Sequence, residues 1–342
     1  LTHRKEGDEM ISISQQTWLQ PWVKLARGER PAEQLRSLSK TLLVPLAGIA
    51  AFLLLWTLAA GQINTSLGAF PGPQDVWQQG SALLDEHAAE RREEAAFYQR
   101  QRERNAERQA QDPSYQPRLF PYTGSPTYID QILTSLVTVT AGFVLASLLA
   151  IPLGIVIGLS NTLYRAFNPV IQLLKPVSPL AWLPLVTMVV SAVYVSQDPA
   201  VPKAFITSMI TVMLCCLWPT VINTAVGVAS VDGDLTNVSR VLRLGWLTHV
   251  RTIVLPSAIP MMFAGLRTSL GIAWMVLIAA EMLAQSPGLG KFVWDQFQNG
   301  SSDSLSRIMV AVIVIGLIGF LLDRLMLMLQ RALVWDKSSV QR

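Results

Sequence analysis

The sequence predicts an all-α protein that crosses a membrane several times, and three observations support this prediction. Of its 342 residues 51% are hydrophobic and only 15% are charged, whereas a soluble domain carries about 25% charged residues. Several apolar runs reach the roughly 20 residues that a helix needs to span the hydrocarbon core. Most of these runs are separated by short connections, several of them basic. We therefore expect a polytopic helical membrane protein with about six spans.

The candidate spans differ in how many charges they contain. Four runs contain no charged residue: 41–60, 132–160, 176–197 and 204–231. A fifth, 259–283, contains Arg267 and Glu281, and a sixth, 308–329, contains Asp323 and Arg324. Asp323 and Arg324 are neighbours in sequence, which predicts a local pair that anchors the helix end at the cytoplasmic surface.

The basic residues predict the orientation of the spans. The N-terminal segment 1–40 contains seven Lys and Arg residues, and by the positive-inside rule it should lie in the cytoplasm. Six spans would return the C-terminal tail 334–342 to the same side. The first apolar run begins after about 40 residues, deeper than a cleaved signal peptide, so we interpret 41–60 as a transmembrane helix that is retained.

Residues 61–130 differ in composition from the rest of the chain. They are rich in Glu, Arg, Gln and Ala, which favour helices, and they lack a wide apolar stripe. Seven basic and ten acidic residues give this segment a net charge of 7 − 10 = −3. We expect a solvated helix or helical hairpin on the extracytoplasmic side. It could be a structured spacer or a docking site for an external partner.

The inventory of reactive residues argues against an enzyme. None of the three histidines, His3, His87 and His249, lies in a span, so no intramembrane histidine metal site is expected. The stretch QSPGLGKF at 285–292 lacks the first glycine of a phosphate-binding loop and has Phe292 where Ser or Thr is needed. We expect no cofactor, no nucleic-acid partner and no ATP hydrolysis by this chain itself.

The few ionisable residues in the spans bear on the energy source. A secondary transporter or channel needs coupling-ion ligands within the membrane, and many such carriers show internal repeats. Here only Arg267, Glu281 and the Asp323–Arg324 pair qualify, and no repeat is evident. An energy source outside the chain is favoured, with a secondary transporter or channel as the alternative.

Two features of the spans are candidates for a translocation path. Arg267, Trp274 and Glu281 recur every seven residues and should share one helix face. An arginine this deep should face protein or a water-filled path, because lipid is costly for it. It could attract a small anion, or it could hold the structure through a carbonyl or an acid. Pro179 and Pro184 mark a candidate bend that lines a cavity or serves only packing.

One amphipathic basic helix is predicted between two spans, at about 234–250. It lies around the stretch NVSRVLRLGWLTHVRTIVLP at 237–256 and could be capped by Asp234 or Thr236. Such a helix suits a groove on another protein, or it could lie on the membrane surface. The residues alone leave both possibilities open.

The end of this stretch resembles a known family. Ile253-x-Leu255-Pro256, with a helix just upstream, is similar to the cytoplasmic signature loop of permease subunits of binding-protein-dependent ABC importers. The sequence departs from that signature at its Glu-Ala-Ala and Gly positions, which fall on 237–239 and Arg243. Further text resembles the nitrate, sulfonate, taurine and bicarbonate permeases, and the nitrate type above all: FPGPQDVW at 70–77, 145–160, 253–283 and GLGKFVWDQFQ at 288–298.

The resemblance implies a type I ABC importer permease fold in a bacterial inner membrane, with a five-helix core over 131–333. It implies a second copy of the permease, cytoplasmic ATPase subunits that bind ATP and Mg, and an extracytoplasmic substrate-binding protein. The implied substrate is a small inorganic anion, nitrate first, with nitrite or cyanate possible and with bicarbonate or an organic sulfonate such as taurine as alternatives. The implied ATPase-coupling helix contains Asn237, Val238, Ser239, Arg240, Val241, Leu242, Arg243, Leu244, Gly245 and Trp246.

Overall fold

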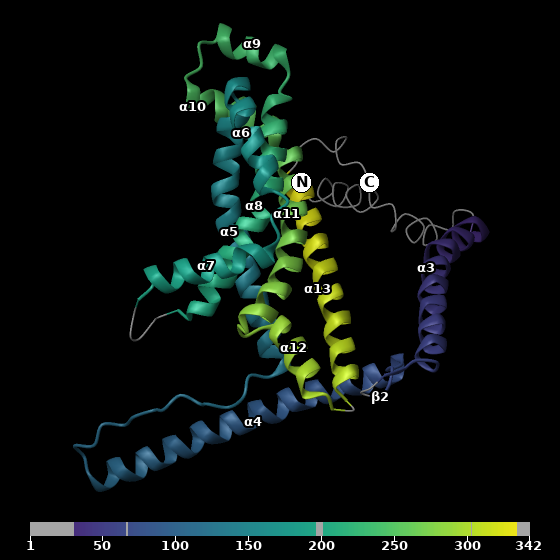
Figure 1. Ribbon diagram of the computed structural model, residues 1–342, viewed down its shortest axis with the longest axis vertical. Helices are drawn as coiled ribbons and strands as arrows, with labels where there is room; N and C mark the ends of the chain where they lie inside the picture. Colours follow the sequence, from purple (N-terminus) through teal and green to yellow (C-terminus); the bar gives the residue numbers. More distant parts are fainter. Residues whose placement is uncertain (1–30, 66–67, 196–200, 302, 334–342) are drawn as a thin grey trace, which may run out of the picture. The chain divides into compact units, whose positions relative to one another are not determined.

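The computed structural model describes residues 31–65, 68–195, 201–301 and 303–333 (Figure 1). The predicted cytoplasmic tail 334–342 and most of the basic N-terminal segment lie outside the described residues. The chain divides into two compact units, Leu1–Asp75 and Val76–Arg342, which we describe separately.

The first unit contains one apolar helix and a small hairpin. Helix α3 (Pro31–Ala60) covers the predicted first span and begins ten residues before it. Strands β1 (Asn64–Thr65) and β2 (Gly68–Ala69) pair antiparallel. The indole Nε1 of Trp56 donates to the carbonyl of Pro71 at 3.1 Å, which fastens the end of α3 to the segment after the hairpin.

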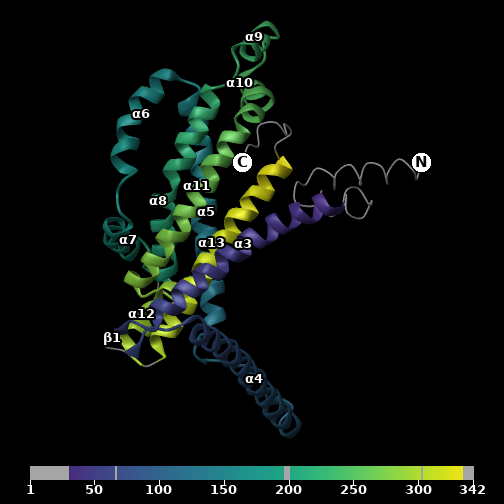
Figure 2. The ribbon, with the colours of Figure 1, turned by 90° about the vertical axis from the view of Figure 1, so that its right-hand side faces the viewer.

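The second unit is built from helices, seen from two directions in Figures 1 and 2. In chain order they are α4 (Pro73–Gln111, which begins in the first unit), α5 (Tyr128–Gly158), α6 (Asn161–Leu174), α7 (Pro179–Val193), α8 (Lys203–Ala229), α9 (Gly233–Val241), α10 (Trp246–His249), the π-helical turn η1 (Val250–Val254), α11 (Leu255–Ala284), α12 (Leu289–Asn299) and α13 (Ser304–Leu333).

Among the described residues, five helices are long and apolar enough to cross a membrane. They are α3, α5, α8, the continuous α10–η1–α11 segment and α13. A sixth span exists only if α6 and α7 are taken together, and these two helices meet at 97°. The predicted span at 176–197 is therefore not a span by itself, because α7 could cross a membrane only together with α6. Its N-terminal part is a break at Pro176, where Ser178 caps the new helix α7.

Helices α5, α8 and α11 pack tightly because small residues lie where they meet. A Cβ atom added to Gly154 of α5 would lie 2.6 Å from Thr224 Cβ of α8, and one added to Gly265 of α11 would lie 2.8 Å from Asn223 Cβ. Ala150, Val221 and Ala225 fill the space between α5 and α8 and are almost fully buried. Close backbone approach through small residues is how helices associate without a hydrophobic driving force in lipid.

The charged insert forms one long helix, and the alternative of a helical hairpin is wrong. Helix α4 has 39 residues, which corresponds to about 60 Å at 1.5 Å per residue. Residues 112–126 then run back along it in extended form. The Gln101 side chain donates to the carbonyl of Phe120 at 2.9 Å and accepts from its N–H at 2.8 Å. Tyr122 donates to Glu90 at 2.8 Å, and this bond raises the pKa of Tyr122 to about 12.

Candidate functional site

The loop between α8 and α11 forms two short helices where the sequence predicts one. Helix α9 is capped by Asp232, whose Oδ1 accepts from the Asp234 N–H at 2.9 Å, so neither predicted cap, Asp234 nor Thr236, is used. The helix stops after Val241 because Arg243 adopts a left-handed conformation, with φ +48°. Helix α10 begins after Gly245. The left-handed conformation of Arg243 at this turn cannot be predicted from the hydrophobic pattern of the sequence alone.

A side-chain hydrogen bond joins the two short helices. His249 Nδ1 of α10 lies 2.8 Å from Ser239 Oγ of α9. The Leu244 N–H also donates to the Ser239 carbonyl at 3.1 Å. Helix α10 continues through η1 directly into α11. Helix α9 is therefore connected to the long helix α11 both by this bond and by the continuous helical segment.

Apolar side chains are exposed together on this loop. Val241 is 82% exposed, and four further large apolar residues are exposed beside it: Val238, Leu242, Trp246 and Leu247. A shallow depression of about 430 Å³ is lined by Asp234, Asn237, Val238, Val241 and Leu242. A contiguous exposed apolar patch of this kind is typical of a protein contact surface.

The three ionisable and aromatic residues singled out on α11 all contact other helices. Arg267 pairs with Asp323 of α13 through two hydrogen bonds, of which Nη2 to Oδ2 measures 2.8 Å. Trp274 Nε1 donates to the Ile315 carbonyl of α13 at 2.9 Å. Glu281 instead contacts α5 and α12 and is 1% exposed. The shared face therefore contacts three neighbouring helices, α13 through Arg267 and Trp274 and both α5 and α12 through Glu281.

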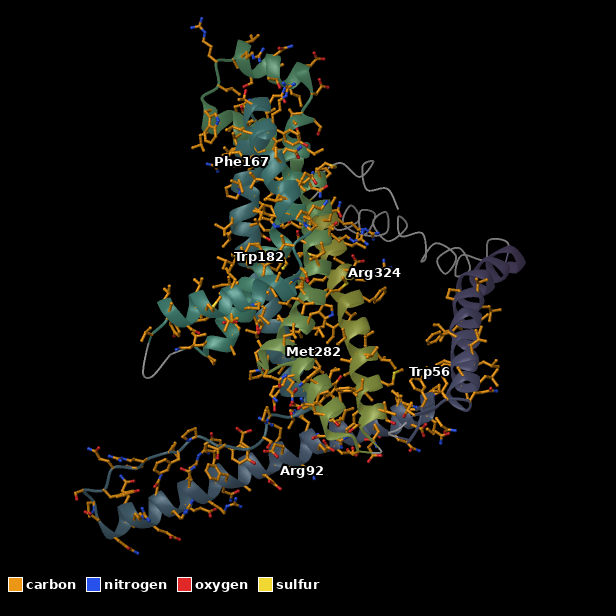
Figure 3. All side chains as sticks on the ribbon, viewed as in Figure 1. Trp56, Arg92, Phe167, Trp182, Met282 and Arg324 are labelled. Carbon is orange, nitrogen blue, oxygen red and sulfur yellow. The ribbon has the colours of Figure 1, made fainter. Side chains whose placement is uncertain are left out.

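The predicted local pair of Asp323 and Arg324 is wrong. Asp323 pairs with Arg267, which is 56 residues away in sequence. The Arg324 guanidinium lies 4.9 Å from the ring centroid of Phe320, one turn earlier on the same helix. Neighbouring helix positions point about 100° apart, so the acid reaches α11 while the arginine remains on the outside of α13 (Figure 3).

The two prolines of the predicted bend lie on α7. Pro179 occupies the first turn, where a missing N–H costs nothing, and Pro184 lies inside the helix. Leu180, between them, lines a cavity of about 320 Å³ together with Met282, Gln285 and Trp294. The bend thus lies beside a cavity, although neither proline is among its lining residues.

Several polar residues of the core were not singled out from the sequence. Ser135 of α5 bonds both Glu281 and the start of α12, Ser208 of α8 pairs with Ser286, and Thr220 of α8 pairs with Ser269 of α11. Of these contacts, only that of Ser135 with Glu281 and the start of α12 could have been suspected from the sequence, through the Gly-Leu-Gly motif at 288–290. Within the part of the chain that the structure describes, no group of three His, Cys, Asp or Glu residues could hold a metal ion.

The base of α4 is attached to the rest of the second unit by polar contacts. Arg307 of α13 pairs with Glu86. Arg91 donates to Asp130 at 3.0 Å, and His87 Nδ1 lies 2.6 Å from Thr127 Oγ1. Thr127 and Asp130 form the capping box of α5. The start of α5 and the base of α4 therefore share one polar network.

Comparison with known proteins identifies the class. Residues 150–335 match the family of binding-protein-dependent transport system inner membrane components. The chain belongs to this family: it is an inner-membrane permease subunit of an ABC importer and is not itself an enzyme. This result confirms the predicted family, the helical fold and the inner-membrane location.

Individual relatives carry different substrate names. The nitrate import permease protein NrtB of Synechococcus elongatus is 41% identical over 195 residues, covering 57% of this chain and 66% of that protein, just under two thirds. The bicarbonate transport system permease protein CmpB of the same organism is 35% identical over 309 residues, covering 89% of this chain and 94% of that protein. The putative aliphatic sulfonates transport permease protein SsuC of Bacillus subtilis is 31% identical over 198 residues, covering 58% and 67%.

One solved structure supports the fold. An inward-facing structure of the MetNI methionine ABC transporter superposes with a TM-score of 0.51, covering 60% of this chain and 95% of that chain. The sequence identity is 13%, so this likeness concerns the fold alone.

Proposed function

We propose that this permease forms the membrane path of an ATP-driven importer for a small inorganic anion, with nitrate as the first candidate. The observation that carries the choice of anion is the 41% identity with the nitrate permease of Synechococcus elongatus. Bicarbonate is the second candidate, because the bicarbonate permease matches along 89% of this chain. ATP and Mg would be bound by partner subunits, and an extracytoplasmic protein would deliver the anion.

The geometry of α9 and α10 supports docking into a cytoplasmic ATPase rather than binding to the membrane surface. A surface helix presents one long continuous apolar face to lipid. Here the chain is broken into helices of nine and four residues and tied back on itself by Ser239 and His249. A compact pair of short helices with exposed apolar side chains is suited to a cleft on a partner protein. This assignment places both termini of the chain in the cytoplasm.

The exposed side of α11 supports a path shared with a second copy of the permease. Arg267 and Asp323 lie within predicted spans, and their side chains are 41% and 35% exposed. An ion pair that is exposed at this level is costly in lipid but acceptable against protein or water. ATP binding and hydrolysis would then shift the paired permeases between inward- and outward-facing states.

Reconstitution tests both the class and the anion. The permease, its ATPase and its binding protein would be placed in vesicles, and uptake of labelled nitrate, bicarbonate and taurine would be measured with and without internal ATP. We expect ATP-dependent nitrate uptake that excess nitrite reduces and taurine does not. Bicarbonate uptake unaffected by nitrate would select the second candidate. Uptake without the ATPase would indicate a secondary transporter or channel.

A further inference from the structure

Glu281 is a buried carboxylate that joins three helices. Ser135 Oγ of α5 donates to it and lies 2.8 Å from Oε1 and 2.9 Å from Oε2. The Gly290 N–H in the first turn of α12 donates to Oε2 at 2.9 Å. The Leu289 N–H donates to Ser135 Oγ at 2.9 Å. The carboxylate and the hydroxyl together satisfy two of the free N–H groups at the start of α12.

The glycines of this segment are required by its close approach to α11. Gly288 has φ +151°, and a Cβ atom there would lie 2.2 Å from the Glu281 carboxylate. A Cβ atom on Gly290 would lie 2.2 Å from the Ile278 carbonyl. The backbone of 288–290 therefore lies directly against α11 (Figure 3, near Met282). No side chain larger than hydrogen fits at either position without moving the segment.

The short connection from α11 to α12 contributes lining residues to two cavities. Ser286 and Pro287 line one of about 390 Å³, together with Thr138 and Phe205. Met282 and Gln285 line the other, of about 320 Å³, with Trp294 of α12. Ser286 is held from the first side, since its Oγ lies 3.0 Å from Ser208 Oγ. Displacement of 285–287 would therefore alter the lining of both cavities.

The closed position of this connection is held by specific bonds and opposed by two costs. Gln285 has φ +51°, a conformation that side chains other than Gly, Asn and Asp adopt at an energetic cost. Among the described residues Glu281 forms no ion pair, so its carboxyl group is buried against neutral donors only. Water would solvate the carboxylate if the connection opened, which compensates for the lost hydrogen bonds.

We propose that residues 285–290 form a gate at the extracytoplasmic end of α11, and that Glu281 and Ser135 are positioning residues that latch it shut. Because the latch ties α12 to α5 and α11, relative movement of these helices during transport would release it. The extracytoplasmic location of this end rests on the orientation in the proposed function. The latch itself depends on no particular substrate.

Cysteine labelling tests the latch in the assembled importer. Leu289 is fully buried, so Leu289→Cys reports opening when a membrane-impermeant maleimide is added outside; the unsubstituted chain, which contains Cys215 and Cys216, gives the blank. Removing one buried bond to the carboxylate should raise labelling about tenfold. We expect this increase when Leu289→Cys is combined with Glu281→Gln, which replaces two carboxylate oxygens by one neutral amide oxygen and so weakens the bonds from Gly290 and Ser135. The same increase is expected with Ser135→Ala.

Ser269→Ala is the matched control, because it removes another buried interhelical hydroxyl pair, Thr220–Ser269 at 2.8 Å. It should leave labelling unchanged. In Leu289→Cys with Glu281 and Ser135 unchanged, labelling should also differ between the ATP-bound and the nucleotide-free importer. If residues 285–290 did not move during transport, labelling would be the same in both states. Equal labelling in all variants, or an equal rise with Ser269→Ala, would overturn the proposal. If Glu281→Gln fails to insert, Ser135→Ala carries the test. A different transported anion would leave these labelling results unaffected.

Discussion

Asp323 of α13 accepts a hydrogen bond from Arg267 Nη2 of α11 at 2.8 Å, so a charged pair links two apolar helices. Nε of Arg267 bonds the second carboxylate oxygen, which makes the pair bidentate. Bidentate geometry uses the planar guanidinium fork, which a lysine lacks. The pair therefore orients α13 on α11 as well as neutralising both charges.

Replacing Arg267 by a neutral residue should impair transport more than replacing it by another cation. Arg267→Gln leaves Asp323 without a cation inside a span, whereas Arg267→Lys keeps one but loses a hydrogen bond. We expect uptake to fall about tenfold or more with Gln and less with Lys. Arg267→Gln combined with Asp323→Asn should recover part of the loss. Equal loss in both single variants, with the complex dissociated in detergent, would instead indicate a structural arginine.

The apolar residues of the coupling loop should be needed for ATPase coupling. Leu242→Asp or Trp246→Asp introduces a charge into the exposed apolar patch, which should weaken docking to the ATPase without affecting membrane insertion. The measurement is ATP hydrolysis stimulated by the binding protein in vesicles. Thr248→Asp is the control, since it adds the same charge at an exposed polar position of α10. Full stimulation in both loop variants would contradict docking at this surface.

The bond between Ser239 and His249 should affect coupling rather than docking. His249→Ala removes the side chain that joins α10 to α9. The loop should still bind the ATPase, but α9 and α10 should move relative to each other when the ATPase moves. We expect fewer anions transported per ATP hydrolysed, with ATPase binding retained. Ser239→Ala should have the same effect, and the double variant should be no worse than either single one. Additive losses would show that the two residues act separately.

Apolar length and charge predict most of the spans, because lipid imposes the same requirement on every residue of a run. The insert is also predicted as helical, since its composition favours a helix without tertiary contacts. The break at Arg243 was not predicted, because it depends on neighbours that override the local pattern. A bend near Pro179 was predicted from the prolines, but its angle of 97° was not. Ser135 was missed because its partner Glu281 lies 146 residues away in sequence.

The buried side chain of Gln101 should contribute strongly to holding the segment that follows α4. Gln101 is buried and forms two hydrogen bonds to the backbone of Phe120. Gln101→Ala removes both bonds, so residues 112–122 should be cleaved several times faster by trypsin, at Arg118, than in the unsubstituted chain. Gln99→Ala, which removes only an exposed bond to Glu103, is the control. Unchanged cleavage would mean that the contacts of Tyr98 and Asn105 with the segment hold it without Gln101.

The close packing of α5 against α8 predicts that replacing a glycine between them by alanine lowers the stability of the permease. Gly154→Ala places a methyl group 2.6 Å from Thr224 Cβ and 2.9 Å from the Val221 carbonyl. Overpacking of a tight core costs about 1–3 kcal/mol, which exceeds the gain of up to about 1 kcal/mol from the better helix propensity of alanine. We expect a lower melting temperature in detergent.

Gly316 of α13 provides the matched control, because a Cβ atom there has no neighbour within 4 Å. Gly316→Ala keeps only the propensity gain, so its melting temperature should stay the same or rise. The two substitutions are chemically identical and both lie inside long apolar helices, so a general effect of alanine on insertion cannot produce opposite signs. A fall of similar size in both variants would show that close contact between α5 and α8 does not set the stability of the permease.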